Sequence, residues 1–287
     1  MKDIKSFSKL FGLNIPVYDH FDYYIEQLSK TQKFKDIKSM IPLFEKAEDD
    51  IGDIYQYKIN KSKEIIEFLK QTRTYEEFNY DNLLPDLPST KNFKYDEGVK
   101  YLSIDLKKAN WQSIKKYDPY FLNELGDSYF DFLSKFDIPE VLMYSKQFRQ
   151  FIFGNINPKR QIKVQRSIIQ TVIDSIDIEP VCIKHDEVIY SYQSINDILN
   201  ILSKFINDDN FNVKLFHIDR VEDFRIDNLL DLNNKVVGKD MVGCNGNLYY
   251  INLKKYITNE ELDIKDLYFR MEGRTALWVN DNLKASL

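Results

Sequence analysis

Hydrophobic side chains recur every three to four residues through positions 18–80, which is the spacing of one face of an α-helix. The recurring positions are Ile25, Leu28, Ile37, Met40, Ile41, Phe44, Ile65, Ile66 and Leu69. The pattern predicts several helices in this part of the chain. It stops at residues 81–92, where Pro85 and Pro88 predict a linker.

Between residues 98 and 192, short apolar runs alternate with segments of helical spacing, so strands and helices are both expected. The pattern predicts a strand at 100–106, helices at 107–117, 120–136 and 139–153, and a strand–turn–strand at 179–192. Asn157-Pro158 predicts the start of a further helix, because Asn caps helices well and Pro suits the first helical position.

The rest of the chain is expected to be rich in β-structure. Residues 211–224, 243–253 and 265–279 are strand-like, and Asn245-Gly246 predicts a hairpin turn. The patterns together predict an α+β protein with three regions. These are a helical N-terminal region at 1–92, a mixed central region at 93–205 and a small β-rich C-terminal region at 206–287.

The composition is that of a folded chain without membrane segments. Its 287 residues are 43% hydrophobic and 14% aromatic, which excludes a disordered protein. No apolar stretch approaches the roughly 20 residues that span a bilayer, and the N-terminus has no apolar signal-peptide core. Two cysteines, Cys182 and Cys244, are too few for a disulfide framework, so both are expected to be core thiols. We therefore expect a cytoplasmic protein that does not bind membranes.

Positive charge is concentrated in one segment of an acidic chain. The formal net charge is −5, yet residues 141–170 contain no Asp or Glu. Their basic residues are Lys146, Arg149, Lys159, Arg160, Lys163 and Arg166. A solvated helix face normally mixes both signs, so this segment favours an anionic, phosphate-bearing partner over a fortuitous surface patch.

Carboxylates stand at two places where predicted strands end. In KYLSIDLKKAN (100–110), Asp105 closes a strand just before a helix, where a carboxylate suits either a metal ion on a phosphate or a helix cap. In IKHDEVIY (183–190), His185-Asp186-Glu187 occupies the reversal of a hairpin, where Gly, Asn or Pro is usual. This turn is either solvated or part of a site.

A basic helix is predicted between these two places, in KQFRQFIFG (146–154). Lys146, Arg149 and Phe153 follow one another at three- and four-residue steps, so they share a helix face. Two cations in line suit a triphosphate, and an aromatic ring beyond them suits a nucleobase. Gly154 allows close approach just past the ring.

The order of these three segments resembles the palm and fingers of the family A polymerase superfamily, which includes the single-subunit phage-type RNA polymerases. KYLSIDLKKAN is similar to its motif A, KQFRQFIFG to motif B and IKHDEVIY to motif C. The short chain most resembles the transposon-and-virus branch. The resemblance covers about residues 98–192 and has departures: Ser145 stands where an Arg is expected, and Asn157-Pro158 where motif B usually has Tyr-Gly.

The resemblance implies a catalytic centre at the two strand ends. Asp105 and Asp186 would together bind two Mg²⁺ ions, for which Mn²⁺ could substitute. Glu187 would be a supporting catalytic carboxylate, and His185 would touch the primer end. The helical N-terminal region would take the place of a thumb.

The resemblance also implies binding roles. Lys146 and Arg149 would hold the β- and γ-phosphates, Phe153 would stack on the base, and Asn110 would lie near the ribose 2′ position. Template or primer backbone would be contacted by Lys159, Arg160, Lys163 and Arg166, which predicts salt-sensitive binding.

The implied function is a nucleotidyltransferase that extends a nucleic-acid 3′ end, with a template-dependent DNA polymerase of viral or mobile-element type as the first expectation. An RNA polymerase or a template-independent terminal transferase on the same palm is an alternative. Two further alternatives are a non-catalytic nucleic-acid-binding protein, which would need neither Asp105 nor Asp186, and a metal-dependent nuclease, which would not need the aligned basic helix.

Overall fold

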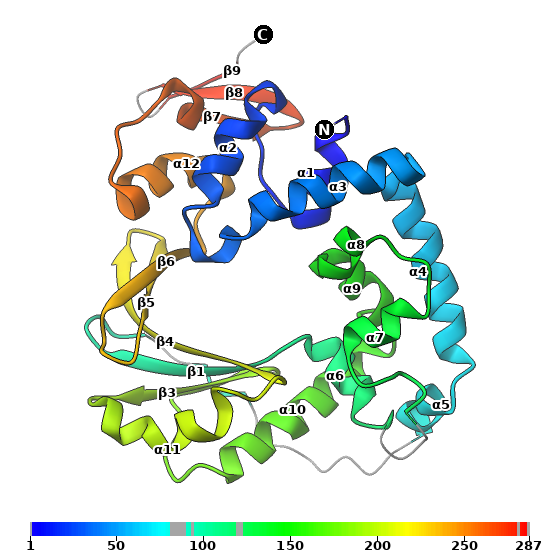
Figure 1. Ribbon diagram of the computed structural model, residues 1–287. Helices are drawn as coiled ribbons and strands as arrows, with labels where there is room; N and C mark the ends of the chain where they lie inside the picture. The colour runs from blue at the N-terminus through cyan, green and yellow to red at the C-terminus, as the bar shows by residue number, and fades with distance from the viewer. Residues whose placement is uncertain (1, 81–89, 93–94, 119–122, 280–281, 286–287) are drawn as a thin grey trace. The chain divides into compact units, whose positions relative to one another are not determined.

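A computed structural model of the chain describes residues 2–80, 90–92, 95–118, 123–279 and 282–285 (Figure 1). The chain divides into two compact units. The central unit comprises residues 51–215, and the terminal unit combines residues 1–50 with residues 216–287. This division differs from the three consecutive regions expected at 1–92, 93–205 and 206–287. Residues 51–80 fold with the central region, and residues 1–50 form one unit with the C-terminal segment. The predicted linker at 81–92 lies mostly outside the described residues.

An antiparallel six-stranded sheet has the order β2-β3-β1-β4-β5-β6. Its strands are β1 (Lys100–Leu106), β2 (Cys182–Ile183), β3 (Glu187–Tyr192), β4 (Phe211–Val221), β5 (Phe224–Leu230) and β6 (Val236–Val242). The boundary between the two units falls within β4, so β2, β3, β1 and the beginning of β4 belong to the central unit. The expected strand at 100–106 and the expected strand–turn–strand are confirmed.

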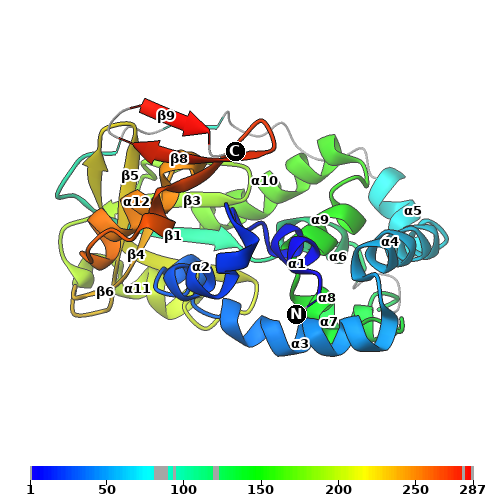
Figure 2. The same cartoon turned by 90° about the horizontal axis from the view of Figure 1, so that it is seen from above.

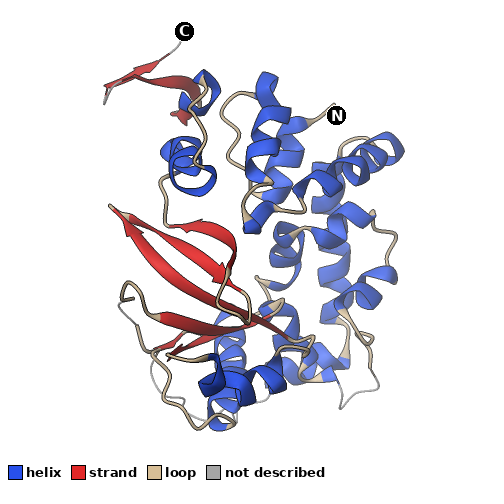
Figure 3. Ribbon diagram, turned by 60° about the vertical axis from the view of Figure 1, so that its left-hand side comes forward, coloured by secondary structure: helices blue, strands red, loops and turns tan. Residues whose placement is uncertain are grey.

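The four strands of the central unit are connected in a way that places β1 between β3 and β4. Helices join β1 to β2, a tight hairpin joins β2 to β3, and a helix joins β3 to β4, which is the split βαβ arrangement. Helices α10 (Pro158–Asp174) and α11 (Ile195–Phe205) contact β3 and lie along it (Figures 1 and 3). Tyr101, Leu102 and Ile104 in β1 are fully buried, so this strand forms part of the core.

The other helices of the central unit lie together to one side of β1 and β3, in the right half of Figure 2. They are α4 (Ile54–Lys70), α5 (Arg73–Tyr80), α6 (Ala109–Lys115), α7 (Tyr129–Ser134), α8 (Glu140–Tyr144) and α9 (Lys146–Phe153). Helix α9 contacts α4, α6 and α8, while α10 contacts α6. These contacts hold α9 beside the helix that follows β1.

The single helix expected at 139–153 is wrong, since the segment forms the two helices α8 and α9. Ser145 separates them because its backbone is extended, and its Oγ accepts a hydrogen bond from the backbone N–H of Phe148 at 3.1 Å. Ser145 thereby caps α9. The helix expected from Asn157-Pro158 is confirmed, with the Asn157 side chain accepting from the backbone N–H of Arg160.

The terminal unit begins with helices, as the hydrophobic spacing predicts. They are α1 (Ile4–Phe11), η1 (Tyr18–His20), α2 (Phe21–Leu28), η2 (Gln32–Phe34) and α3 (Ile37–Ile51), whose last residue already belongs to the central unit. The aromatic side chains of Phe7, Phe21 and Phe44 meet in its core, with the ring centroids of Phe7 and Phe44 5.3 Å apart.

The C-terminal part of this unit is only partly β-structure. The helical segments η4 (Gly246–Leu248), α12 (Tyr249–Asn252), η5 (Leu253–Thr258) and η6 (Ile264–Leu267) precede a sheet of β7 (Tyr268–Met271), β8 (Arg274–Val279) and β9 (Asn282–Ala285). The hairpin expected at Asn245-Gly246 is wrong. The Asn245 side chain instead accepts from the backbone N–H of Asn247 at 3.0 Å and starts the helical segment.

The structure also bears on the expectations from composition. Cys182 is buried, as expected, whereas Cys244 is half-buried, with its Sγ 3.3 Å from Asn252 Nδ2. Both cysteines are free thiols. Within the described ranges, no helix has the length and apolar character that a bilayer span needs.

Candidate functional site

Three acidic residues lie together where β1 ends and the β2–β3 hairpin turns. Asp105 is directly opposite Glu187 in the β1–β3 ladder, so the two side chains lie on the same face of the sheet. The backbone N–H of Leu106 donates to the carbonyl oxygen of Asp186 at 2.8 Å, which fixes the turn beside the end of β1. The two acidic segments singled out in the sequence are therefore adjacent in space.

The Asp105 carboxyl group is electrostatically unfavourable in its charged form. Burial, followed by the nearby charges of Glu187 and Asp186, raises its pKa to about 6. A hydrogen bond from Asn212 Nδ2 at 3.4 Å and the charge of Lys214 oppose this rise. Burial and the two neighbouring carboxylates therefore disfavour the charged form of Asp105 more than Asn212 and Lys214 favour it.

Glu187 differs from Asp105, since both of its oxygens have partners. Ser103 Oγ donates to Glu187 Oε1 at 2.6 Å, and Lys184 Nζ donates to Oε2 at 2.5 Å. The Glu187 carboxylate is therefore held against the sheet and the hairpin. In this arrangement it supports the neighbouring carboxylates and does not point freely toward a ligand.

A hollow of about 280 Å³ opens beside these carboxylates, and most of the expected ligand-binding residues line it. Its lining includes Asp105 and Asp186 on the carboxylate side, Lys146 and Arg149 from α9, and Asn110 from α6. The structure therefore brings together residues from the three segments that suggested a nucleotide site. Sequence spacing alone could not show that α9 faces the ends of the strands.

The cations and carboxylates around this hollow do not neutralise one another. Among the described residues, neither Lys146 nor Arg149 forms an ion pair with Asp105 or Asp186, and no side-chain hydrogen bond to Asp186 is present. The Arg149 guanidinium lies 5.7 Å from the centroid of the Tyr129 ring. Burial lowers the Arg149 pKa, and the Tyr129 side chain partly opposes that effect. Side chains of both charge signs thus line one hollow without forming ion pairs with one another among the described residues.

Asn110 is held in a defined orientation at the edge of the hollow. Its Oδ1 accepts a hydrogen bond from Gln165 Nε2 at 3.0 Å, which leaves its Nδ2 as the group available to a ligand. A Cβ atom at Gly154 would collide with the carbonyl oxygen of Gln150, so the backbone at the end of α9 requires glycine, and Asn110 Nδ2 would lie at an ordinary contact distance of 3.4 Å. The pair Asn110 and Gln165 joins α6 to α10 at this edge.

Phe153 does not have the exposure that base stacking requires, which corrects the expectation for this residue. Its side chain is fully buried and packs against Trp111, Tyr129 and Phe132, with ring-centroid distances of 5.6, 6.2 and 5.9 Å. Lys146 lies at the exposed beginning of α9, whereas Phe153 lies at its buried end. Residues on one helix face can therefore meet different environments along the helix axis.

The basic residues expected to contact nucleic acid divide into two groups. Lys159 and Lys163 on α10 are exposed, as is His185 in the hairpin turn. Arg166 is only 4% exposed, and its guanidinium donates to the carbonyl oxygen of Lys184. The Arg160 guanidinium lies over the rings of Phe78 and Tyr117, at 5.7 and 5.9 Å. Arg160 and Arg166 therefore serve internal contacts, contrary to the expectation that they bind a nucleic-acid backbone.

The two aspartates suit a metal ion that arrives with a phosphate ligand. In the described part of the chain, no group of three or more His, Cys, Asp or Glu side chains is arranged to hold a metal ion. Mg²⁺ in nucleotide sites, however, is commonly held by one or two carboxylates together with substrate phosphates and water. Asp105 and Asp186 supply that number, and both line the hollow that also holds Lys146 and Arg149. These residues fit Mg²⁺, or Mn²⁺ in its place.

The structure adds residues to the hollow that the sequence patterns did not single out. Lys108, Gln150 and Asn212 also line it, and Asn212 lies on β4, far from the other residues in sequence. The exposed rings of Phe130 and Tyr144 form a pair with centroids 5.5 Å apart, and the Lys108 ammonium lies over Phe130. Lys108 could have been found from the basic pair that follows Asp105. Asn212 has no such signal in the sequence.

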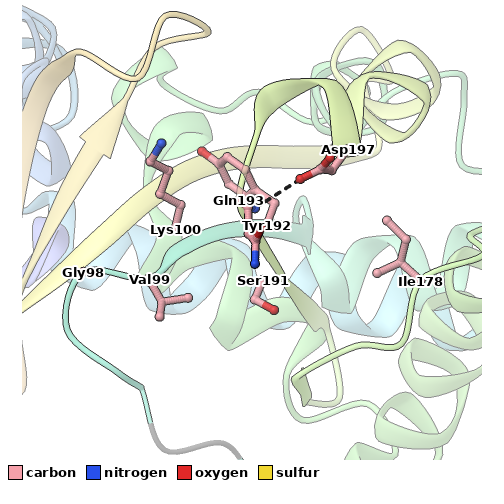
Figure 4. A pocket seen from close by; sticks show the side chains of 8 residues that line it. All are labelled: Gly98, Val99, Lys100, Ile178, Ser191, Tyr192, Gln193 and Asp197. Atoms are coloured by element: carbon pink, nitrogen blue, oxygen red, sulfur yellow. Dashed lines mark hydrogen bonds between the residues drawn. The ribbon is translucent and has the colours of Figure 1, made fainter.

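A larger hollow of about 570 Å³ lies at the other end of β1 and β3 (Figure 4). Lys100 and Tyr192, which are paired across the ladder, line it together with Asp197. Asp197 accepts hydrogen bonds from the backbone N–H groups of Gln193 and Ser194, so its carboxylate serves as a helix cap. Among the described residues, the one carboxylate that lines this hollow is therefore already engaged within the protein, unlike Asp186 in the hollow at the end of β1.

Comparisons of the chain with protein-family models, with curated proteins and with solved structures found no match. The chemistry of the residues at the hollow is therefore the basis for inferring a function.

Proposed function

We propose that the protein is a nucleotidyltransferase that extends the 3′ end of a nucleic acid with nucleoside triphosphates, in the manner of the polymerases it resembles. One observation carries the proposal. Two carboxylates and the cations Lys146 and Arg149 line one hollow without forming ion pairs among the described residues. A metal–triphosphate complex carries both the positive and the negative charge that such a hollow can accept.

The carboxylate side of the hollow would hold the metal ions. Asp105 and Asp186 would bind Mg²⁺ once a triphosphate is present, and Glu187 would keep their surroundings negative while held by Ser103 and Lys184. Bound Mg²⁺ would lower the pKa of the attacking hydroxyl group and neutralise charge on the triphosphate. Asn212 would keep Asp105 oriented through its hydrogen bond.

The cationic side of the hollow would position the triphosphate. Lys146 is exposed at the beginning of α9, and Arg149 is one turn further along the same face. The Tyr129 ring supports the Arg149 guanidinium, which restricts its orientation before a phosphate binds. Positioning and charge stabilisation are the main contributions that a protein makes to phosphoryl transfer.

Nucleic acid would be bound by exposed positive charge outside the hollow. Lys159 and Lys163 occupy positions one turn apart on α10 and are exposed. His185 is exposed in the hairpin turn next to Asp186, where a primer end would need to lie. A DNA polymerase remains the first expectation, with an RNA polymerase or a terminal transferase as alternatives on the same site.

Primer extension tests the proposal and separates it from its rivals. The protein is incubated with Mg²⁺, a labelled primer–template and nucleoside triphosphates, and the primer length is measured. Extension is expected, and it should be lost in Asp105→Asn and in Asp186→Asn while both variants stay folded. Shortening of the primer would indicate a nuclease. Binding with no change in length would indicate a non-catalytic nucleic-acid-binding protein.

A template-free reaction distinguishes the remaining alternatives. Extension of a single-stranded primer at a similar rate would point to a terminal transferase. Extension by either aspartate variant at the wild-type rate would contradict the assignment of Asp105 and Asp186.

A further inference from the structure

Lys108 has a backbone conformation that is unusual for its residue type. Its φ is 52° and its ψ is 45°, in the left-handed region, at the position that precedes α6. Four of the seven non-glycine residues with positive φ in the described chain are Asn, which tolerates this region, whereas Lys does not favour it. Strained residues cluster at binding and active sites, which makes the side chain of Lys108 a candidate for a role in the hollow.

The side chain of Lys108 lies against two aromatic rings in the lining of the hollow. Its ammonium is 4.7 Å from the Phe130 ring centroid and 5.4 Å from that of Tyr129. The Arg149 guanidinium also lies over Tyr129, so one ring supports two cations. Burial and, next, the charge of Arg149 lower the Lys108 pKa. A bound anion would offset both effects, because it favours the charged form of the ammonium.

The carboxylate influence on the Lys108 ammonium comes from the charge of Asp209, which slightly opposes the lowering of its pKa. Among the described residues the ammonium forms no ion pair, although Asp105 and Asp186 line the same hollow. Contacts of a cation with aromatic rings are weaker than charge-assisted hydrogen bonds to phosphate oxygens. The rings can therefore hold the ammonium near the hollow and release it to a phosphate.

We propose that Lys108 is a third phosphate-binding cation, which acts with Lys146 and Arg149 to select a linear triphosphate over shorter phosphates. This inference rests on the proposed function and deepens it, because it names the part of the substrate that the hollow recognises. Three cations from two segments suit a chain of phosphates better than a single phosphate group. The volume of about 280 Å³ is at the lower end of ligand pockets, which supports recognition of the phosphate chain with its metal ion.

Because the backbone at Lys108 is strained, a substitution there should affect stability differently for a binding role and for a structural role. Asn and Gly adopt the left-handed region at lower cost than Lys, so Lys108→Asn should unfold at the same temperature as the wild type or at a higher one. The same substitution should weaken triphosphate binding, because it removes the ammonium. A residue kept only for structure would show the opposite pattern, with lower stability and unchanged binding.

The test uses the full chain and inorganic tripolyphosphate, which lacks the base and sugar. Binding is measured by calorimetry with Mg²⁺ at low ionic strength, and orthophosphate and pyrophosphate provide the comparison of chain length. We expect Lys108→Asn to weaken tripolyphosphate binding by about 10- to 100-fold. The ratio of the affinity for tripolyphosphate to the affinity for orthophosphate should fall as well. Lys107→Asn is the matched control, since Lys107 carries the same charge but does not line the hollow. Its charge acts on the site only from a distance, so the loss of tripolyphosphate affinity should be far smaller than in Lys108→Asn. Lys108→Arg should retain part of the affinity.

The outcomes also separate this inference from the proposed function. Tripolyphosphate binding that depends on Lys108, without any primer extension, would support the inference and contradict the polymerase. Primer extension together with wild-type tripolyphosphate affinity in Lys108→Asn would overturn the inference alone. The inference would also be overturned if the wild type did not bind tripolyphosphate, or if Lys107→Asn and Lys108→Asn lost equal affinity for it. A markedly lower unfolding temperature of Lys108→Asn would overturn it too.

Discussion

Asp105 and Glu187 lie directly opposite each other in the β1–β3 ladder, yet of the two only Glu187 forms an ion pair among the described residues. Lys184 neutralises Glu187, and Ser103 takes its other oxygen. Within the described ranges, the Asp105 side chain accepts one hydrogen bond, from Asn212, and burial with the nearby carboxylates raises its pKa to about 6. This asymmetry makes Asp105 the carboxylate that would gain most from a bound cation.

Replacing Asp105 should stabilise the protein at neutral pH when no divalent cation is present. Its pKa is raised from 3.8 to about 6 in the folded state, so its contribution to stability is present below pH 4 and is lost as the pH rises through 6. Asp105→Asn avoids that loss and should raise the unfolding free energy at pH 7.5 by at most about 3 kcal/mol. Urea denaturation in chelator at pH 4 and at pH 7.5 measures the difference. Asp96→Asn is an exposed control in the same unit, and an equal effect of Asp105→Asn at both pH values would contradict the assignment.

Divalent cations should stabilise the wild type and not the aspartate variants. Mg²⁺ or Mn²⁺ would relieve the charge repulsion at Asp105 and bind only the folded state, which raises the unfolding temperature. The gain should be about 2–4 °C for each kcal/mol of binding free energy, and larger when a triphosphate is also present. Thermal unfolding with chelator, with Mg²⁺ and with Mg²⁺ plus tripolyphosphate gives the comparison. If Mg²⁺ raised the unfolding temperature of Asp105→Asn and Asp186→Asn as much as that of the wild type, the cation would bind elsewhere.

Substitutions on α9 and α10 should separate nucleotide binding from nucleic-acid binding. Lys146→Ala and Arg149→Ala should weaken nucleotide affinity by about tenfold or more, because each removes a charge-assisted contact to phosphate. The double variant Lys159→Ala with Lys163→Ala should weaken primer–template binding. The slope of log affinity against log salt concentration should fall by the amount expected for the loss of up to about two phosphate contacts. Titrations of nucleotide and of primer–template, made separately, check both statements. Identical defects in the two titrations would remove the distinction.

Phe153 should matter for stability and not for stacking on a base. Its ring is fully buried among three other aromatic rings, so Phe153→Ala should lower the unfolding free energy by about 3–5 kcal/mol. Phe151→Ala is the matched control on the same helix, because Phe151 is 38% exposed and should cost far less. Urea denaturation measures both variants. A stable Phe153→Ala protein with weakened nucleotide binding would restore the stacking role.

Asn110 should disfavour ribonucleotides. Gln165 holds its amide in place, so the side chain is expected to crowd a 2′-hydroxyl group, which costs more than one hydrogen bond of roughly 0.5–1.5 kcal/mol returns. We expect the wild type to prefer deoxynucleotides and Asn110→Gly to gain ribonucleotide use. Competition of both nucleotide types on one primer–template is the measurement. A wild-type preference for ribonucleotides that Asn110→Gly weakens would show that Asn110 recognises the hydroxyl, and the enzyme would be an RNA polymerase.

The sequence by itself determined the elements whose signals are local. The strand at 100–106, the strand–turn–strand and the helix at Asn157-Pro158 follow from alternation, turn position and capping, each of which acts within a few residues. Asp105 and Asp186 could be placed at strand ends for the same reason. Asn245-Gly246 shows the limit, because the same short signal suits a hairpin or the start of a helical turn.

Only the tertiary structure decided which side chains reach the hollow. Helical spacing puts Lys146, Arg149 and Phe153 on one face, but Phe153 lies about 10 Å further along the axis, where other rings surround it. Arg160 and Arg166 turn inward because Phe78, Tyr117 and the carbonyl oxygen of Lys184 come from segments distant in sequence. Packing between distant segments sets these environments, and the pattern of a single segment carries no information about that packing.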